Sequence, residues 1–382
     1  MSYGQVSTWL AWVPKENAEL AHRVFKTNGW LRSDVHPLTK SNLVGFPLLH
    51  NPPQEALERT CKGRFPLPQM NIQEVTVHPS IVPHASMRHA VGMWLKDRNI
   101  VTNELLDSLP AKWERLGELI LLPYGTFDGT EWNEVKSHAE LPTLWHQIAE
   151  SLGGTSLALQ APIANDGYRS PQIELLHGTT EVRFTDHNVA YAFDAGQVMW
   201  SSGNVTERRR IGALDLTGEV VIDAYAGVGY YTLPMLVHGK AACVHACEWN
   251  PASIEGLRTS AALNGVESRL KVHDGDNAAS MATLLGVANR VHLGLLPSSE
   301  PAWEAAIRCL NDEGGWLHVH MNVEEKAIDD WVKATVNSLN LIASEWQRPW
   351  RLQPHHLERV KWFSPRVRHV VLDVQTVVDS MN

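Results

Sequence analysis

From residue 219 to its end, the chain alternates short hydrophobic runs with segments whose hydrophobic residues recur every three or four positions. Runs of the first kind are typical of buried strands, and segments of the second kind are typical of helices. We expect strands at residues 219–224, 243–248, 270–273, 291–295, 316–321 and 367–374. Because strands and helices alternate, the pattern predicts an α/β fold with a doubly wound parallel sheet, whose ligands bind beyond the carboxyl ends of the strands.

The helices expected between these strands cover residues 230–237, 250–264, 278–285, 302–310 and 324–339. The second of them has the clearest ends. Asn250 is suited to the N-cap, Pro251 to the first turn, and Asn264 with Gly265 to the end of the helix.

The first 200 residues have a less regular pattern. We expect a strand at residues 8–13, a helix at 16–26, a proline-rich segment at 46–68, helices at 90–96 and 103–109, strands at 116–122 and 173–176, and a loop near 125–133. The chain is therefore expected to have three parts. These are an N-terminal segment (1–65), a smaller α+β middle domain (66–195) and an α/β domain that binds a ligand (196–382).

The composition narrows the class of protein. The 382 residues are 44% hydrophobic and 20% charged, as in folded globular proteins. The net charge of −9 argues against a protein that coats nucleic acid, although it does not exclude local basic patches. The longest uncharged run, residues 224–239, is shorter than the roughly 18 residues of a membrane span, and the start lacks the basic segment of a signal peptide. With only four cysteines, we expect a cytoplasmic protein in a reducing compartment.

A glycine-containing turn follows the first strand of the α/β domain. Gly227 and Gly229 allow the backbone to turn sharply and to approach a ligand at the start of a helix. A dinucleotide site would have a third glycine near position 232, which is Thr232 here. The segment from Asp223 through Tyr225 to the two glycines therefore suits S-adenosylmethionine better. The alternative is a turn whose glycines serve packing alone.

Acidic residues also follow the next two strands. Glu248 lies 25 residues after Asp223, near the spacing at which a carboxylate accepts hydrogen bonds from ribose hydroxyls. Its neighbour Trp249 is suited to lie against an adenine ring, and Asp276 with Asn277 is suited to the polar edge of that ring. The alternatives are a helix-capping cluster at residues 247–251 and a plain turn at residues 274–277.

Two further segments flank the expected ligand site. Residues 294–300 follow the fourth strand and bring Leu295 and Pro297 to the site. Many methyltransferases that alkylate a nitrogen have Asn or Asp before this proline, whereas this chain has Leu296, which indicates a different nucleophile or a different transferred group. Residues 200–210 include the densest basic run of the chain, Arg208–Arg210, for which the alternative is a solvated charge run.

Together these segments closely resemble the tRNA wybutosine-synthesising aminocarboxypropyltransferases, the sister family of the tRNA guanine N1-methyltransferases. The resemblance is strong over residues 165–382 and weaker at residues 112–117. It is carried by residues 201–210, 223–234, 247–251, 294–300, 318–320 and 358–374. The combination of Gly-Leu-Leu-Pro-Ser-Ser-Glu at 294–300 with Cys-Glu-Trp-Asn-Pro at 247–251 distinguishes this family from the N1-methyltransferases, which have Asn-Leu-Pro in the first segment.

The resemblance implies a class I methyltransferase-like (Rossmann-like) fold and an enzyme. It implies transfer of the 3-amino-3-carboxypropyl group of S-adenosylmethionine to C7 of 4-demethylwyosine in tRNA(Phe), with methylthioadenosine as the leaving product. S-adenosylmethionine would be a co-substrate, with no metal, no membrane and no obligate protein partner. By motif position, the cofactor contacts fall on Ser201, Arg208, Glu248, Asp276 and Asn277, and we expect Ser201 and Arg208 to position the transferred group.

The tRNA needs its own contacts, and basic residues among tryptophans suit a splayed anticodon loop. The candidates for phosphate binding are Arg209, Arg210, Arg359, Lys361 and Arg366. The part of the sequence around Arg359, Lys361 and Arg366 also contains Trp346, Trp350 and Trp362. The alternative is that the basic residues form a solvated surface without a tRNA contact and that the tryptophans are packed in the core.

Three other functions stay open from the residues. The first is an N1-methyltransferase of the same tRNA, against which Leu296 before Pro297 speaks. The second is a catalytically idle protein that binds tRNA, and the third is a small-molecule methyltransferase.

Cys243, His245 and Cys247 share one face of a strand, and this spacing rarely completes a tetrahedral metal site, so we expect them to be packed in the interior.

Overall fold

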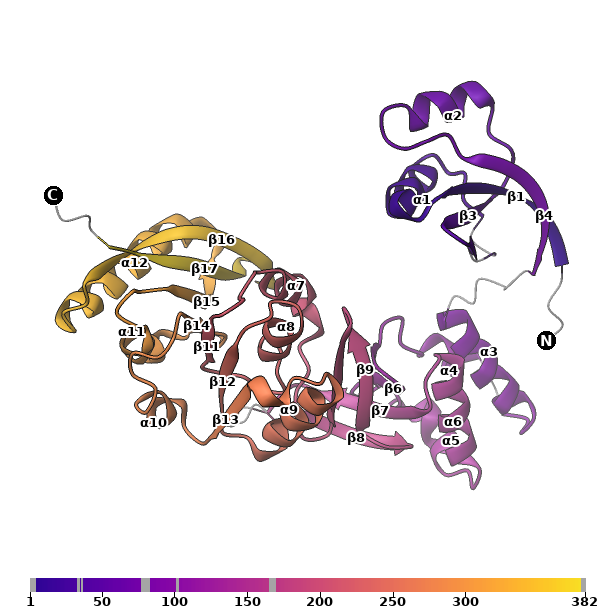
Figure 1. Ribbon diagram of the computed structural model, residues 1–382. Coiled ribbons are helices and arrows are strands. Elements are labelled where there is room, and N and C mark those ends of the chain that lie inside the picture. Colours follow the sequence, from indigo (N-terminus) through magenta and orange to yellow (C-terminus); the bar gives the residue numbers. More distant parts are fainter. Residues whose placement is uncertain are drawn as a thin grey trace. The chain divides into compact units, whose positions relative to one another are not determined.

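The computed structural model describes residues 5–32, 35, 37–76, 83–100, 103–164 and 170–378, and it divides into two compact units. One unit comprises residues 1–89 and the other residues 90–382 (Figure 1). Each unit has its own secondary structure.

The first unit contains a four-stranded antiparallel sheet in the order β2-β3-β1-β4. Its elements are β1 (Gln5–Pro14), α1 (Ala18–Thr27), β2 (Leu38–Lys40), β3 (Leu43–Leu48), α2 (Gln54–Cys61) and β4 (Gln69–Thr76). Phe25 of α1 packs edge to face on Phe46 and on Phe65, which closes the core. The strand and the helix predicted at the start are confirmed, whereas the proline-rich segment was not expected to hold β3 and α2.

The second unit begins with a mixed sheet in the order β5-β6-β7-β8, in which only β6 and β7 are parallel. Its elements are α3 (Pro83–Lys96, which starts before the unit), α4 (Asn103–Asp107), β5 (Glu114–Leu116), β6 (Leu119–Pro123), α5 (Asn133–Lys136), α6 (Leu141–Ser151), β7 (Ser156–Ala161) and β8 (Gln172–His177). The single strand predicted at residues 116–122 is wrong. A turn at Gly117, with φ of +59°, splits it into β5 and β6.

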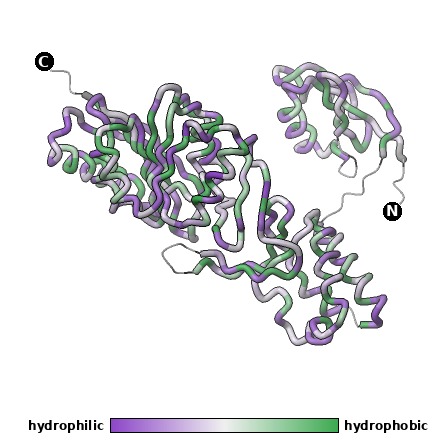
Figure 2. The backbone as a smooth tube through the Cα atoms, turned by 60° about the horizontal axis from the view of Figure 1, so that its bottom comes forward, coloured by the Kyte–Doolittle hydropathy of each residue, from purple (hydrophilic) through white to green (hydrophobic). Residues whose placement is uncertain are grey.

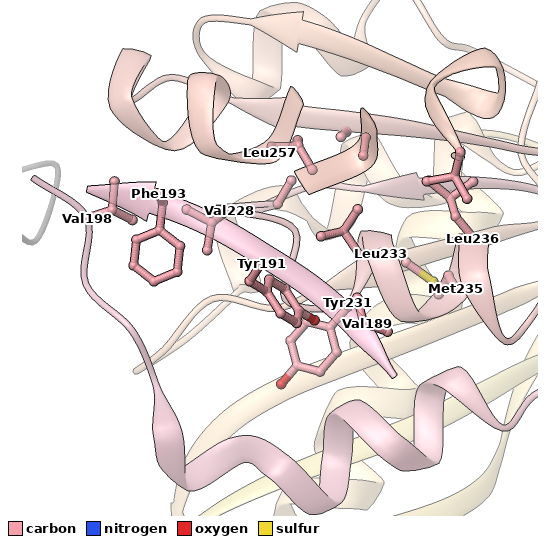
Figure 3. Close-up of a cluster of buried hydrophobic side chains, with 14 of the residues drawn as sticks. Val189, Tyr191, Phe193, Val198, Val228, Tyr231, Leu233, Met235, Leu236 and Leu257 are labelled. Carbon is pink, nitrogen blue, oxygen red and sulfur yellow. The ribbon is translucent and has the colours of Figure 1, made fainter. Parts of the chain in front are cut away.

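A hairpin of β9 (Glu181–Asp186) and β10 (Val189–Asp194) follows. Its two turn residues, His187 and Asn188, both have positive φ angles, as a tight type I′ turn requires. The buried side of β10 presents Val189, Tyr191 and Phe193 to the core that also holds Leu233 and Leu257 (Figure 3). The hairpin is therefore joined to the α/β domain through a shared hydrophobic core.

The α/β domain contains a seven-stranded sheet in the order β13-β12-β11-β14-β15-β17-β16. The strands are β11 (Val220–Asp223), β12 (Cys243–Glu248), β13 (Leu270–Asp274), β14 (Arg290–Leu293), β15 (Trp316–Glu324), β16 (Trp350–Ser364) and β17 (Val367–Val378). The first five in this order are parallel, which confirms the predicted doubly wound sheet there. At the other edge the strand predicted at residues 367–374 is confirmed as β17, which runs antiparallel to β15 and pairs with β16, a strand that the sequence pattern did not predict.

Helices cover both faces of this sheet (Figure 1). They are α7 (Val205–Gly212), α8 (Thr232–Val237), α9 (Pro251–Leu263), α10 (Asn277–Met281), α11 (Trp303–Cys309) and α12 (Ile328–Glu345). Leu233 of α8 and Leu257 of α9 belong to the same core as Val221, whereas Ile307 of α11 and Leu339 of α12 belong to a second core. The five expected helices are confirmed with shifted ends, and α7 was not predicted as a helix.

Hydrophobic and hydrophilic positions are interleaved along the chain (Figure 2). In the part that the structure describes, no helix combines the length and the hydrophobicity needed to cross a bilayer.

The face of the sheet beneath α7 has a polar interior. His320 of β15 lies between His292 of β14 and His369 of β17, with ring nitrogens 3.1 and 3.0 Å apart. His318 of β15 is 2.6 Å from a carboxylate oxygen of Asp373. All four histidines are buried, so the interior holds polar rings that depend on one another for hydrogen bonds.

These histidines predict a loss of stability in mild acid. Burial lowers the pKa of His318 and of His369 to about 4. Below pH 6.5 the unfolded chain takes up protons that the folded chain does not bind, so stability is lost as the pH falls toward 4. Each of the two residues should cost about 1.4 kcal/mol between about pH 7.5 and pH 5.5. Denaturant unfolding at the two pH values measures the loss.

The variant His369→Gln should reduce this pH dependence, whatever its effect on stability at neutral pH. The matched control is His355→Gln, which changes an exposed histidine of β16 and should leave the dependence as it is. Equal pH dependence in all three proteins would contradict the prediction.

Candidate cofactor and transfer site

The carboxyl ends of β11, β12 and β13 bring the predicted acidic segments together. The backbone N–H of Gly227 donates to Glu248 over 2.7 Å, and the N–H of Gly275 donates to the carbonyl of Glu248 over 3.0 Å. The side-chain amide of Asn277 donates to the carbonyl of Ala224 over 3.3 Å. Segments whose contacting residues are 21 or more positions apart in sequence therefore form one surface at this edge of the sheet.

The glycine turn needs both of its glycines. Gly227 has a φ angle of +56° and Gly229 one of +93°, a region that disfavours other residues. A Cβ atom at position 229 would lie 2.7 Å from Leu233 and 2.8 Å from Leu257. Packing thus explains Gly229 fully, while Gly227 lies beside the carboxylate of Glu248.

Asp223 shapes the turn from inside. Its side chain is fully buried and accepts a hydrogen bond from the hydroxyl of Thr232 over 2.7 Å. The backbone N–H of Tyr225 lies 3.4 Å from its other oxygen. Thr232, which occupies the position of the missing third glycine, is therefore the residue that holds this carboxylate.

Glu248 binds the backbone of two loops at once. One carboxylate oxygen accepts from the N–H groups of Trp249 and Asn250 over 3.0 and 2.8 Å, and the other accepts from Gly227. Burial raises the pKa of this carboxyl despite the three hydrogen bonds, which act in the opposite direction. A carboxylate accepts about four hydrogen bonds, so it retains capacity for a hydroxyl group of a ligand.

The third segment also combines capping with ligand-binding capacity. Asp276 caps α10 by accepting from the N–H groups of Ala278 and Ala279 over 2.9 and 3.2 Å. Only one of its carboxylate oxygens takes part in these two bonds. Trp249, which was expected to lie against an adenine ring, is 49% exposed.

Ser201 and Arg208 lie together at the start of α7. The guanidinium of Arg208 donates to the backbone carbonyl of Ser201 over 2.8 Å and forms an ion pair with Asp186 at 2.8 and 2.9 Å. It also lies over the ring of Trp200. The structure thus gives the buried Arg208 a half-buried carboxylate partner that the sequence did not predict.

Arg210 is a correction to the predicted phosphate contacts. Its guanidinium binds Glu207 through two hydrogen bonds of 2.8 Å and Asp373 through bonds of 2.6 and 3.0 Å. Glu207 is fully buried. Because the guanidinium is committed to two carboxylates in the interior, we do not retain it as a phosphate contact.

Exposed basic residues occur elsewhere near this edge. Arg209, Arg359 and Arg366 are exposed, although Arg359 also approaches Glu325. Lys361 is half-buried, and its ammonium lies 3.5 Å from the hydroxyl of Ser201.

The tryptophans near the C-terminus divide between surface and core. Trp362 is exposed and lies beneath the guanidinium of Arg368, and Trp346 is exposed beside Arg308. Trp350, in contrast, is buried, so the core interpretation holds for it.

The other histidines and cysteines have structural surroundings. His245 is 2.8 Å from His273, and Cys247 is buried in the core. Within the described ranges, no group of three or more His, Cys, Asp or Glu side chains is arranged to hold a metal ion. His355 and His356 lie within β16.

Comparisons with known proteins agree with this geometry. Residues 183–347 match the TRM5/TYW2 methyltransferase domain, and residues 95–181 match the TYW2 N-terminal domain. The chain is 37% identical over 339 residues to the tRNA wybutosine-synthesizing protein 2 homolog of Homo sapiens, covering 75% of this chain and 74% of that protein. It is 39% identical over 381 residues to the tRNA wybutosine-synthesizing protein 2/3/4 of Oryza sativa, covering 95% of this chain.

The chain spans about a third of the length of its plant relatives, 35% of the rice protein and 29% of the Arabidopsis thaliana protein. Among solved structures, TYW2 of P. horikoshii in complex with MeSAdo is 26% identical, with a TM-score of 0.60, and covers 76% of this chain and all of that one. Trm5b of Pyrococcus abyssi is 20% identical, with a TM-score of 0.56, over 97% of this chain and 99% of that one, which shows a shared fold. The expected class I methyltransferase-like fold is confirmed.

The three hydrogen bonds accepted by Glu248 predict the effect of a small substitution. In Glu248→Gln, an amide N–H group replaces one of the oxygens and faces a backbone donor that it cannot satisfy. We expect a loss of about 1–3 kcal/mol in the free energy of unfolding, measured with denaturant. The control is Glu255→Gln, at an exposed position of α9, which should change little. Identical unfolding midpoints for the two variants would show that the carboxylate does not hold the loops.

Proposed function

The chain belongs to the family of tRNA wybutosine-synthesizing protein 2, and on that premise we propose that it transfers the 3-amino-3-carboxypropyl group of S-adenosylmethionine to a tRNA base. The base is 4-demethylwyosine beside the anticodon of tRNA(Phe), and C7 of this base is the nucleophile. The observation that carries the proposal is the arrangement of Asp223, Glu248, Asp276 and the glycine turn at one edge of the sheet.

This arrangement suits the adenosine part of S-adenosylmethionine. The oxygen of Glu248 that accepts from Gly227 can also accept from a ribose hydroxyl. The second carboxylate oxygen of Asp276 is suited to the amino group of adenine, and the side chains of Asn277 and Trp249 lie in the adjoining segments. S-adenosylmethionine supplies an electrophilic carbon and a neutral thioether leaving group.

The reaction is a displacement at carbon. A bond forms between C7 of the base and the γ-carbon of the cofactor while the bond from this carbon to sulfur breaks. Both electrons of the broken bond go to sulfur, so methylthioadenosine leaves as a neutral molecule. The base then loses its C7 proton to water or to a backbone carbonyl.

The enzyme has to choose among three carbons on the sulfonium, of which the methyl carbon is the least hindered. Alignment of one carbon with the nucleophile is worth several orders of magnitude in rate, so orientation decides which group moves. Ser201, held through its carbonyl by Arg208, lies where it can keep the aminocarboxypropyl arm turned toward the base.

The loop at residues 294–300 is consistent with a carbon nucleophile. Its Leu296 has no side-chain acceptor for the amine of a target base, and Leu295 and Pro297 are apolar. The carbonyl of Pro297 accepts from the N–H of Asn322 over 2.9 Å, which fixes the loop on β15. The N1-methyltransferases have Asn-Leu-Pro in this segment, and the position of that Asn is occupied here by Leu295.

We place the tRNA on the same edge of the domain. Arg209, Arg359 and Arg366 are the exposed cations retained as phosphate contacts, and Trp362 is an exposed stacking surface nearby in sequence. The middle domain, predicted at residues 66–195 although β4 within that range belongs to the sheet of the first unit, serves as a further platform for the tRNA. The protein acts in the cytoplasm.

The first prediction of this proposal concerns the product. Incubation with S-adenosylmethionine and tRNA(Phe) bearing 4-demethylwyosine should give methylthioadenosine, with the matching mass gain on the base, as detected by mass spectrometry. S-adenosylhomocysteine as the product would instead identify a methyltransferase. A protein that binds the cofactor and gives neither product would contradict the proposed substrate.

The second prediction concerns tRNA binding. Each phosphate contact releases counterions from the tRNA when the complex forms, and a variant that lacks one contact releases fewer. We therefore expect a lower salt dependence of tRNA affinity for each of Arg209→Ala, Arg359→Ala and Arg366→Ala. The slope of log K against log salt should decrease by about 0.7–0.9 for each lost contact. Lys240→Ala is the control, because Lys240 is exposed just before the amino end of β12, at the opposite edge of the sheet. An unchanged slope in all three arginine variants would refute this placement.

A further inference from the structure

A polar row crosses the sheet beside the predicted transfer site. Asn322 of β15 is in register with His369 of β17, and His369 is in register with Lys361 of β16. Neighbouring strands are about 4.8 Å apart, so the Cα atoms of Asn322 and Lys361 are about 10 Å apart. Residues in register on paired strands share one face of the sheet, and Lys361 reaches Ser201, just before the short helix η3 (Ser202–Asn204). The row therefore lies on the face of the sheet that Ser201 also contacts.

Two members of the row have buried polar atoms without partners. Neither atom of the side-chain amide of Asn322 has a hydrogen-bond partner among the residues that the structure describes, and the same is true of Nδ1 of His369. The other ring nitrogen of His369 lies 3.0 Å from His320. Burying an unpaired amide is costly, and such groups in native proteins usually bind water or a ligand.

The row touches two residues assigned above to the cofactor site. At one end the N–H of Asn322 donates to the carbonyl of Pro297 over 2.9 Å. At the other end the ammonium of Lys361 lies 3.5 Å from the hydroxyl of Ser201.

The charges at this place favour Lys361 over Arg208 as the partner of a carboxylate. The guanidinium of Arg208 is paired with Asp186 at 2.8 Å, and its side chain is only 3% exposed. The ammonium of Lys361 lies 3.5 Å from the hydroxyl of Ser201. A carboxylate bound beside both groups would gain a charge-assisted hydrogen bond from Lys361.

We propose that Asn322, Lys361 and Ser201 bind the amino-carboxylate end of S-adenosylmethionine, the part that is transferred to the base. Lys361 and Ser201 bind the carboxylate, and the amide oxygen of Asn322 accepts from the ammonium group. This assignment rests on the proposed function, since it requires S-adenosylmethionine as the co-substrate. It moves Lys361 from the set of tRNA contacts to the cofactor site.

The target base is a poorer occupant of the row. A tricyclic base carries no anionic group that a lysine would bind, whereas the arm of the cofactor carries both a carboxylate and an ammonium. An anchor at this end also directs the γ-carbon, rather than the methyl carbon, toward the face where the base enters. The row thus selects the γ-carbon over the methyl carbon, a choice that the sulfonium itself does not favour.

The test compares ligands with and without the amino-carboxylate end. Isothermal titration should show that Lys361→Met and Asn322→Leu each weaken the binding of S-adenosylmethionine and of S-adenosylhomocysteine by about 10-fold or more. Methylthioadenosine lacks this end, so its affinity should change by less than about 2-fold. The control is Lys240→Met, which makes the same change at the opposite edge and should leave all three affinities as they are.

The other outcomes separate the alternatives. If all three ligands lose affinity equally, the substitutions distort the pocket and the assignment is wrong. If none loses affinity while the affinity for tRNA falls, the row binds the base or the tRNA backbone, and the assignment is again wrong. If the unchanged protein binds none of the three ligands, the proposed function itself fails.

Discussion

The position of the transfer site depends on a buried pair of carboxylates and the arginine between them. Arg210 of α7 binds Glu207 on its own helix and Asp373 on β17, 163 residues away in sequence. Asp373 in turn receives a hydrogen bond from the ring of His318. Loss of one partner would leave an uncompensated charge in the interior, which typically costs about 3–5 kcal/mol. Because α7 begins shortly after Ser201, this network fixes the position of Ser201 and Arg208 relative to the sheet.

At the other side of the site, the carboxylates that suit the cofactor also hold the loops that surround it. Glu248 accepts three backbone N–H groups from two loops, and Asp276 caps a helix. The alternatives of a capping cluster and a ligand site are therefore not exclusive. A carboxylate that is already fixed by backbone donors loses little freedom when a ligand hydroxyl arrives, so structural hydrogen bonds prepare the site for binding.

The sequence pattern predicted the parallel part of the fold because its strands are short, hydrophobic and buried on both faces. β16 escaped prediction for the opposite reason. β16 is an edge strand of 15 residues, many of them charged or polar, and its pairing with β17 shifts register at three places. An exposed strand of this kind has neither a hydrophobic run nor a regular alternation to mark it. The same strand contributes Lys361, so the sequence pattern did not place this member of the polar row in the sheet.

For the site residues too, the spacing in the sequence predicts position, whereas the interaction partners become known only from the fold. Glu248 and Asp276 follow strands directly, so topology alone brings them to one edge. The roles of the arginines could not be obtained in this way, because the identity of their partners is a property of the folded chain. Arg208 and Arg210 are two positions apart in one basic run, yet each ends in the interior beside a carboxylate from a distant segment. A dense run of arginines indicates charge that must be compensated, and only the tertiary structure tells whether protein carboxylates or a ligand do so. In this chain Arg208 and Arg210 are paired with protein carboxylates, and the cation proposed to bind the carboxylate of the cofactor, Lys361, belongs to β16, far from the run in sequence.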